Sequence, residues 1–68
     1  MDWKERFKQE YEELCERCEK LELMLSKYAN NELDFVSNCP MWILNKQLEA
    51  MIEYKQILEA RNYIEKIW

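Results

Sequence analysis

The stretch FKQEYEELCERCEKLELMLSKY, residues 7–28, decides the fold. Its apolar and aromatic residues recur in alternating steps of four and three: Phe7, Tyr11, Leu14, Cys18, Leu21, Leu25 and Tyr28. This spacing puts side chains on one seam of an α-helix that packs against a second helix. Asp2 and Glu5 suit the start of such a helix and Lys27 suits its end, so we expect it to span about residues 2–28.

A second helix is expected after a connection at about residues 29–39. The pattern stops at Ala29-Asn30-Asn31, where an Asn can take the left-handed conformation that ends many helices. Ser37 followed by Pro40 suits the N-cap and first turn of a new helix, which we place at about residues 40–67. We expect the connection to be ordered and to fold back over the end of the hairpin, because it contains three large apolar residues: Leu33, Phe35 and Val36.

The composition agrees with an all-α fold. The chain has no Gly and one Pro, while 35% of its residues are charged and 49% are hydrophobic. We expect a single domain over residues 1–68, folded as an antiparallel two-helix hairpin. A chain this short buries only about 60% of its unfolded surface on folding, so its own core is marginal and a partner is expected.

The second helix carries more apolar surface than one neighbour can cover. Placed at 100° per residue, its apolar residues form one arc: Leu44, Leu48, Met51 and Leu58 on one side, then Ile43, Ile57, Ile64 and Trp68 on the other. The arc is about 200° wide, whereas a stripe of about 100° is enough to cover one neighbour. We therefore expect the hairpins to assemble into a homo-oligomeric helical bundle.

Charge and hydropathy exclude several classes of partner. The 10 Lys and Arg residues against 14 Asp and Glu residues give a net charge of −4, without a basic block, which argues against binding to long nucleic acids. No apolar run is long enough to span a membrane, and the charged N-terminus does not resemble a signal peptide. Three cysteines, an odd number, fit a reducing cytoplasm.

The sequence argues against catalysis, metal binding and a cofactor. Cys15 and Cys18 lie one turn apart within a helix, where packing is the simpler interpretation, and Cys39 is the only other soft ligand. The chain has no His, which removes the commonest general base and the commonest partner of a Ser or Cys nucleophile. We expect a protein that is not an enzyme.

Four polar or aromatic residues recur every seven positions within the apolar arc of the second helix: Gln47, Tyr54, Arg61 and Trp68. A buried guanidinium is costly unless paired, so Arg61 either meets a carboxylate, such as that of Glu65, or faces an anion. Rings, a guanidinium and an amide are also what a nucleotide site requires. A structural role in helix register explains the pattern equally well.

Rings and ammonium groups also alternate near the N-terminus: Trp3, Lys4, Phe7, Lys8 and Tyr11. Two interpretations stay open for this segment. It can form a second part of an anion site, or an apolar seam flanked by lysines whose ammonium groups extend into solvent.

The chain resembles a known group of proteins. The segments that carry the resemblance are Leu33-Asp34-Phe35, Asn38-Cys39-Pro40, Leu44 and Gln47-Leu48-x-Ala50-Met51-x-x-Tyr54-x-x-Ile57-Leu58-x-x-Arg61. They resemble small helical-hairpin proteins of crAss-like and other bacteriophages. These in turn are similar to the anti-CBASS and anti-Thoeris sponges, which sequester cyclic nucleotide signals of bacterial immunity. The resemblance implies a homo-oligomer, often a hexamer, with ligand pockets between protomers and no catalysis.

We therefore expect a phage anti-defence sponge that captures a cyclic oligonucleotide messenger in the cytoplasm of the host bacterium. Arg61, with Lys4 or Lys8 of a neighbouring chain, would face phosphate. Tyr54, Tyr11 or Trp3 would stack on a base, and Gln47 would bind the polar edge of a base. The messenger can be a cyclic dinucleotide, a cyclic trinucleotide or a signal derived from ADP-ribose. The alternative is a structural hairpin whose wide apolar face binds a host or phage protein.

Overall fold

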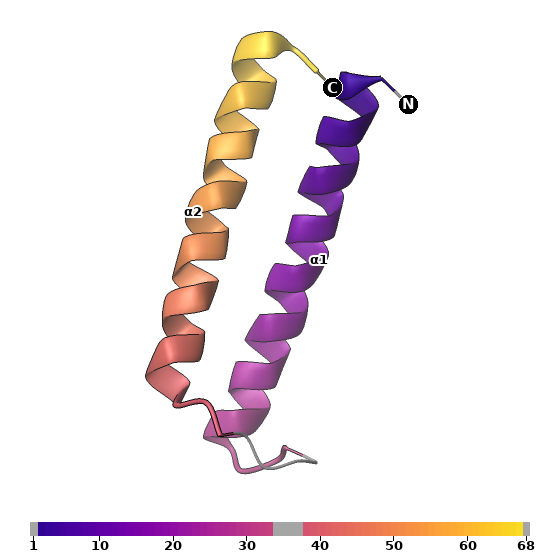
Figure 1. The fold of residues 1–68 in the computed structure, drawn as a ribbon. Helices are drawn as coiled ribbons and strands as arrows, with labels where there is room; N and C mark the ends of the chain where they lie inside the picture. Colours follow the sequence, from indigo (N-terminus) through magenta and orange to yellow (C-terminus); the bar gives the residue numbers. More distant parts are fainter. Residues whose placement is uncertain (1, 34–37, 68) are drawn as a thin grey trace.

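Two helices lie side by side and run in opposite directions (Figure 1). The computed structural model describes residues 2–33 and 38–67. Helix α1 spans Trp3–Ala29 and helix α2 spans Met41–Glu65. The start of α1 and the end of α2 lie at the same end of the molecule, which we call the open end, opposite the connection (Figure 1). The expected all-α hairpin is confirmed.

Capping interactions at both ends explain the bounds of α1. A carboxylate oxygen of Asp2 accepts a hydrogen bond from the backbone N–H of Glu5 at 2.8 Å. At the other end Asn31 is left-handed, with φ 57°, and the N–H of Glu32 donates to the carbonyl of Lys27 at 2.8 Å. This is the hydrogen-bond pattern of a Schellman motif. The expected left-handed Asn is therefore confirmed at Asn31.

The sequence-based bounds of α2 need correction at both ends. Pro40 is the N-cap and not part of the first turn, because its ψ of 146° is extended, while its carbonyl accepts from the N–H of Leu44 at 3.4 Å. At the other end, left-handed Lys66 donates its N–H to the carbonyl of Asn62, which ends the helix before Ile67. Five residues used in the sequence analysis lie outside the described residues: Asp34, Phe35, Val36, Ser37 and Trp68.

The core follows the heptad seam and divides into two clusters. The cluster near the open end consists of Phe7, Leu14, Cys18 and Leu58. The cluster near the connection consists of Leu21, Leu25 and Leu44. Leu48 and Met51 are partly buried and pack against both clusters, so the side of the apolar arc that contains them faces α1. Across the part of the chain that the structure describes, neither helix is long and apolar enough to cross a membrane.

The cysteines are packing residues or lie beside the core. Cys18 is buried, and this burial raises the pKa of its thiol, which makes the reactive thiolate scarcer. Cys15 and Cys39 are partly buried, and none of the three cysteines forms a disulfide within the described residues. Among residues 2–33 and 38–67, no group of three or more Cys, Asp or Glu side chains could hold a metal ion.

Half of the apolar arc of α2 stays uncovered in the single hairpin. Four aliphatic residues one heptad apart, which we call the outer stripe, are exposed: Ile43, Ala50, Ile57 and Ile64. The exposed fractions of the three isoleucines are 41%, 57% and 75%. The sequence-based expectation that one hairpin seam leaves these isoleucines largely in contact with water is confirmed.

Leu58→Ala should lower the free energy of unfolding by about 2–5 kcal/mol, because Leu58 is fully buried between the helices and its loss leaves a cavity. Leu23→Ala is the matched control, since Leu23 is 58% exposed on α1 and should change that free energy by less than about 0.5 kcal/mol. Urea unfolding at one protein concentration measures both. Equal effects of the two substitutions would contradict this core.

Candidate ligand-binding site

The structure separates the candidate ligand-binding residues into two groups, on opposite edges of the helix pair. On α2, Arg61 and Asn62 lie on opposite sides of the buried Leu58, because each residue advances about 100° around the helix. On α1, Glu10 contacts Tyr54 on one edge, whereas its neighbour Tyr11 borders the other edge. Within one chain, Arg61 and Tyr11 therefore lie on different edges of the helix pair.

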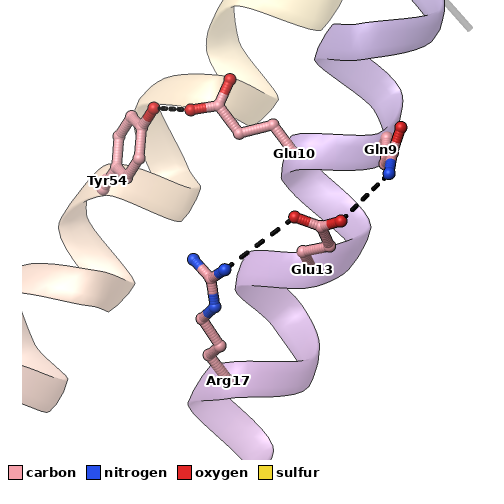
Figure 2. A network of polar contacts seen from close by, with 5 residues as sticks. All are labelled: Gln9, Glu10, Glu13, Arg17 and Tyr54. Carbon is pink, nitrogen blue, oxygen red and sulfur yellow. Dashed lines mark hydrogen bonds and ion pairs between the residues drawn. The ribbon is translucent and has the colours of Figure 1, made fainter.

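The first edge, which we call the Arg61 edge, is held by a hydrogen bond between the helices. The Tyr54 hydroxyl donates to a carboxylate oxygen of Glu10, and Figure 2 shows the two side chains pointing toward each other. This hydrogen bond, with a smaller effect of burial, raises the pKa of Tyr54, while the charge of Arg61 acts in the opposite direction. The hydroxyl of Tyr54 is thus already engaged within the hairpin.

Glu13 organises the neighbouring turns of α1. Gln9 donates from Nε2 to Oε1 of Glu13 at 3.1 Å, and an Arg17 nitrogen lies 3.9 Å from the other carboxylate oxygen (Figure 2). Arg17 and Glu13 are both substantially exposed, so this pair contributes little to stability. These contacts remain within α1 and do not reach Arg61.

Arg61 is exposed in the hairpin, which corrects the expectation that its guanidinium is buried. The reason is that α1 covers only the other half of the apolar arc. Within the described residues Arg61 makes no ion pair, so the contact with Glu65, one of the alternatives that the sequence left open, is not formed. Its Cζ atom instead lies 4.7 Å from the ring centroid of Phe7. This cation–π contact leaves the N–H donors of the guanidinium able to bind oxygen atoms.

Gln47 lies far from Arg61 on the same helix. The two residues are 14 positions apart, which corresponds to a rise of about 21 Å, too long for one base and its phosphate to bridge. Gln47 directs its Nε2 atom toward the Met51 sulfur at 3.9 Å. Trp3 is 53% exposed, and the ammonium group of Lys4 lies 6.0 Å from its ring centroid.

The second edge contains a hollow at the open end, which we call the Tyr11 hollow. Its volume is about 710 Å³, which lies within the usual range for small-molecule sites. The hollow is open to solvent, and residues from both helices line it: Tyr11, Glu59, Asn62, Tyr63, Ile64 and Lys66. Two phenol rings, an amide, a carboxylate and an ammonium group thus meet at one place.

Lys4 and Lys8 belong to the side of α1 that borders this hollow. Together with Tyr11 they are spaced by four and three residues, which aligns them on one helix face. Both lysines are exposed. Three of the residues chosen from the sequence, Lys4, Lys8 and Tyr11, thus share one face of α1, and of these three Tyr11 lines the hollow.

Sequence reasoning missed the contribution of α2 to the hollow. Four of its lining residues follow the spacing of a single helix face: Glu59, Asn62, Tyr63 and Lys66. That regular spacing was available in the sequence. The spacing did not indicate a binding site, because a polar face of this kind is typical of a helix surface in water.

The environment of Tyr11 keeps its phenol protonated over a wide pH range. Burial, together with hydrogen bonds and charge interactions that involve Cys15 and Glu59, raises the pKa of Tyr11 to about 12. The phenol therefore remains neutral and able to donate a hydrogen bond wherever the hairpin is folded at physiological pH.

Comparison with known proteins identifies the family. Residues 1–63 match the model of the family described as Sequestin. The chain belongs to the Sequestin family. Sequestin is a sequestering, non-catalytic family, which agrees with the sponge proteins that the sequence resembles. No curated protein and no solved structure matches the chain.

The stability of the hairpin should fall as the pH rises from about 10 to 12. The unfolded chain ionises Tyr11 near pH 10, whereas the folded chain holds its proton to about pH 12, so deprotonation favours unfolding in this window. Tyr11→Phe should make the decline less steep. Urea unfolding at pH 9, 10 and 11 measures this, and an unchanged slope in the variant would contradict the assignment.

Proposed function

We propose that the protein is a sponge that binds a cyclic oligonucleotide messenger in the Tyr11 hollow and holds it without cleaving it. The observation that carries this proposal is the hollow itself, a concave surface of about 710 Å³ where aromatic, amide and basic side chains converge. Membership of a sequestering family supports capture as the mode of action. The absence of His from the chain is consistent with binding without catalysis.

The base contacts are assigned to residues of both helices. Tyr11 and Tyr63 offer rings on which a base can stack, as in other sites for unpaired nucleotides. The amide of Asn62 and the carboxylate of Glu59 can bind the polar edge of the base, and a carboxylate accepts from an exocyclic amino group. A purine that carries such a group fits this set of side chains.

The phosphate contacts are assigned to Lys4, Lys8 and Lys66. Lys66 lines the hollow, and the other two lie on the same side of α1 as Tyr11. This assignment replaces the expected phosphate contact of Arg61, which lies on the opposite edge. Because the whole chain carries a net charge of −4, such a local group of cations is needed to bind an anion.

The biological setting follows from the same proposal. The protein would be encoded by a bacteriophage and act in the cytoplasm of the infected bacterium, against a defence system of the CBASS or Thoeris type. Capture is stoichiometric, so the affinity must keep the free messenger below the concentration that activates the host effector. A neighbouring chain in a homo-oligomer would close the open side of the hollow.

One observation favours a second candidate function. The outer stripe leaves a continuous aliphatic surface on α2, with Ile57 and Ile64 more than half exposed. A structural or protein-binding hairpin would use this surface to bind a helix of a host or phage protein. Such a protein would not need the aromatic and basic residues of the hollow.

Native mass spectrometry with cyclic di-AMP, cyclic tri-AMP and cyclic ADP-ribose tests the proposed function. We expect one of these probes to bind in a fixed ratio to the chain and to be released with unchanged mass after denaturation. A probe recovered in cleaved form would instead show an enzyme. Failure of all three probes to bind at micromolar concentration would favour the protein-binding hairpin.

Two matched substitutions locate the site for the probe that binds. Tyr63→Ala should weaken binding about tenfold or more, because base stacking on an aromatic ring contributes about 1–3 kcal/mol. Trp42→Ala is the control, since Trp42 is an exposed aromatic residue at the other end of α2. Calorimetric titration measures both. Equal affinities of the two variants would rule out stacking on Tyr63.

A second pair of substitutions decides which edge binds phosphate. Lys8→Ala and Arg61→Ala each remove one positive charge from an exposed residue. We expect Lys8→Ala to weaken binding several-fold and Arg61→Ala to leave the affinity within about threefold of the original. The opposite result, with the assembly intact, would place the phosphate at the Arg61 edge.

A further inference from the structure

We infer that the turn after α2 lowers the stability of the hairpin in favour of binding. Lys66 takes a left-handed conformation that is unfavourable for lysine, and this conformation keeps its ammonium group at the Tyr11 hollow as an anion contact. Ile67 is the positioning residue that holds Lys66 there. The inference rests on the proposed function, because the anion is the anionic part of the bound messenger.

Both helices end at a left-handed residue, but the two residues differ in how well they suit that conformation. Helix α1 is followed by Asn31 with φ 57°, and helix α2 is followed by Lys66 with φ 54°. Asn enters this region readily because its short polar side chain can form local hydrogen bonds, whereas the Cβ atom of Lys crowds the following carbonyl oxygen. Gly or Asn is the usual residue at such a position. Lys66 therefore makes the end of α2 less stable than it could be.

The packing of Ile67 offsets the cost of the turn. The backbone N–H of Lys66 donates to the carbonyl of Asn62, and the N–H of Ile67 donates to the same carbonyl at 3.4 Å. The side chain of Ile67 is partly buried and packs against the core cluster near the open end. Figure 1 shows the chain turning from the end of α2 toward the start of α1. A left-handed residue at position 66 is what allows this return to the core.

The same turn brings Lys66 to the Tyr11 hollow. With Ile67 packed on the core, the preceding side chain lines the hollow. Within residues 2–33 and 38–67 Lys66 makes no ion pair, although Glu59 lines the same hollow. Its positive charge is therefore available to an anionic group of a ligand, with which an ammonium group forms a charge-assisted hydrogen bond.

The charges around the end of α2 make this cation necessary. The last carbonyl groups of a helix carry a partial negative charge, and Glu59 and Glu65 add two carboxylates to this part of α2. Among the described residues that line the hollow, Lys66 is the only cation. Without Lys66, an anion on the α2 side of the hollow would meet negative potential alone.

Thermal unfolding at one protein concentration tests the cost of the turn. Lys66→Gly and Lys66→Asn should each raise the melting temperature by about 2–8 °C, because Gly and Asn enter the left-handed region more easily. Asn31→Gly is the matched control at the end of α1 and should raise it by less. An unchanged or lower melting temperature in both Lys66 variants would overturn the inference.

Calorimetric titration tests the anion contact with whichever of cyclic di-AMP, cyclic tri-AMP and cyclic ADP-ribose binds the wild type. The more stable variants Lys66→Gly and Lys66→Asn should bind about tenfold more weakly or worse, because they lose a charged hydrogen-bond donor. Lys66→Arg keeps the charge and should stay within about threefold of the wild type, as should Asn31→Gly. Wild-type affinity in Lys66→Gly would overturn the inference and leave the proposed function standing.

Inorganic pyrophosphate separates the inference from the proposed function if none of the three messengers binds. Nuclear magnetic resonance would follow the backbone N–H signals of Asn62 and Tyr63 during titration to millimolar concentration. Saturable shifts in the wild type that are absent from Lys66→Gly would support the anion contact and contradict the messenger. No shift in the wild type would overturn both.

Ile67→Ala tests the positioning role. It should weaken binding several-fold in the wild-type background and have no further effect in Lys66→Gly, because Ile67 acts through Lys66. Met41→Ala is the control, since Met41 is also partly buried but packs against the cluster near the connection, and its loss should lower stability without changing the affinity. An equal loss of affinity from Ile67→Ala in both backgrounds would overturn the positioning role.

Discussion

The burial of Leu58 against α1 is the contact on which the rest of this structure depends. Leu58 is fully buried beside Phe7, Leu14 and Cys18, and the two helices share only this seam and its continuation toward the connection. A pair of helices can bury one face of each member and no more. Every other apolar side chain of α2 must therefore stay in water or find a surface outside the hairpin.

The same constraint arranges the polar residues. Once Leu58 points toward α1, its helical neighbours are divided between two edges, with Arg61 on one and Asn62 on the other. The Arg61 edge adjoins the outer stripe and is suited to contact between protein chains. The Tyr11 hollow lies on the opposite edge and is suited to a small molecule. The two surfaces meet at Ile64, which lines the hollow and also belongs to the outer stripe.

Local patterns in the sequence were enough to predict the hairpin, because heptad spacing and a left-handed Asn act over a few residues. They were not enough for the start of α2, where the extended ψ of Pro40 decides between N-cap and first turn. The candidate site was predicted only in part. Which edge a residue occupies depends on how each helix is rotated about its axis, and an apolar arc of about 200° leaves that rotation of α2 undetermined. Arg61 and Tyr11 were therefore assigned to one site although they lie on different edges.

The antiparallel arrangement also shapes the electrostatic potential at the open end. There the N-terminus of α1, with its partial positive charge, lies beside the C-terminus of α2, with its partial negative charge (Figure 1). The backbone itself therefore sets up a gradient across the Tyr11 hollow, in the same direction as the charges of Lys4, Lys8 and Glu59, while the charge of Lys66 at the end of α2 opposes it. A bound molecule that has an anionic part and an amino group would be oriented by this gradient, with its anionic part toward α1 and its amino group toward α2.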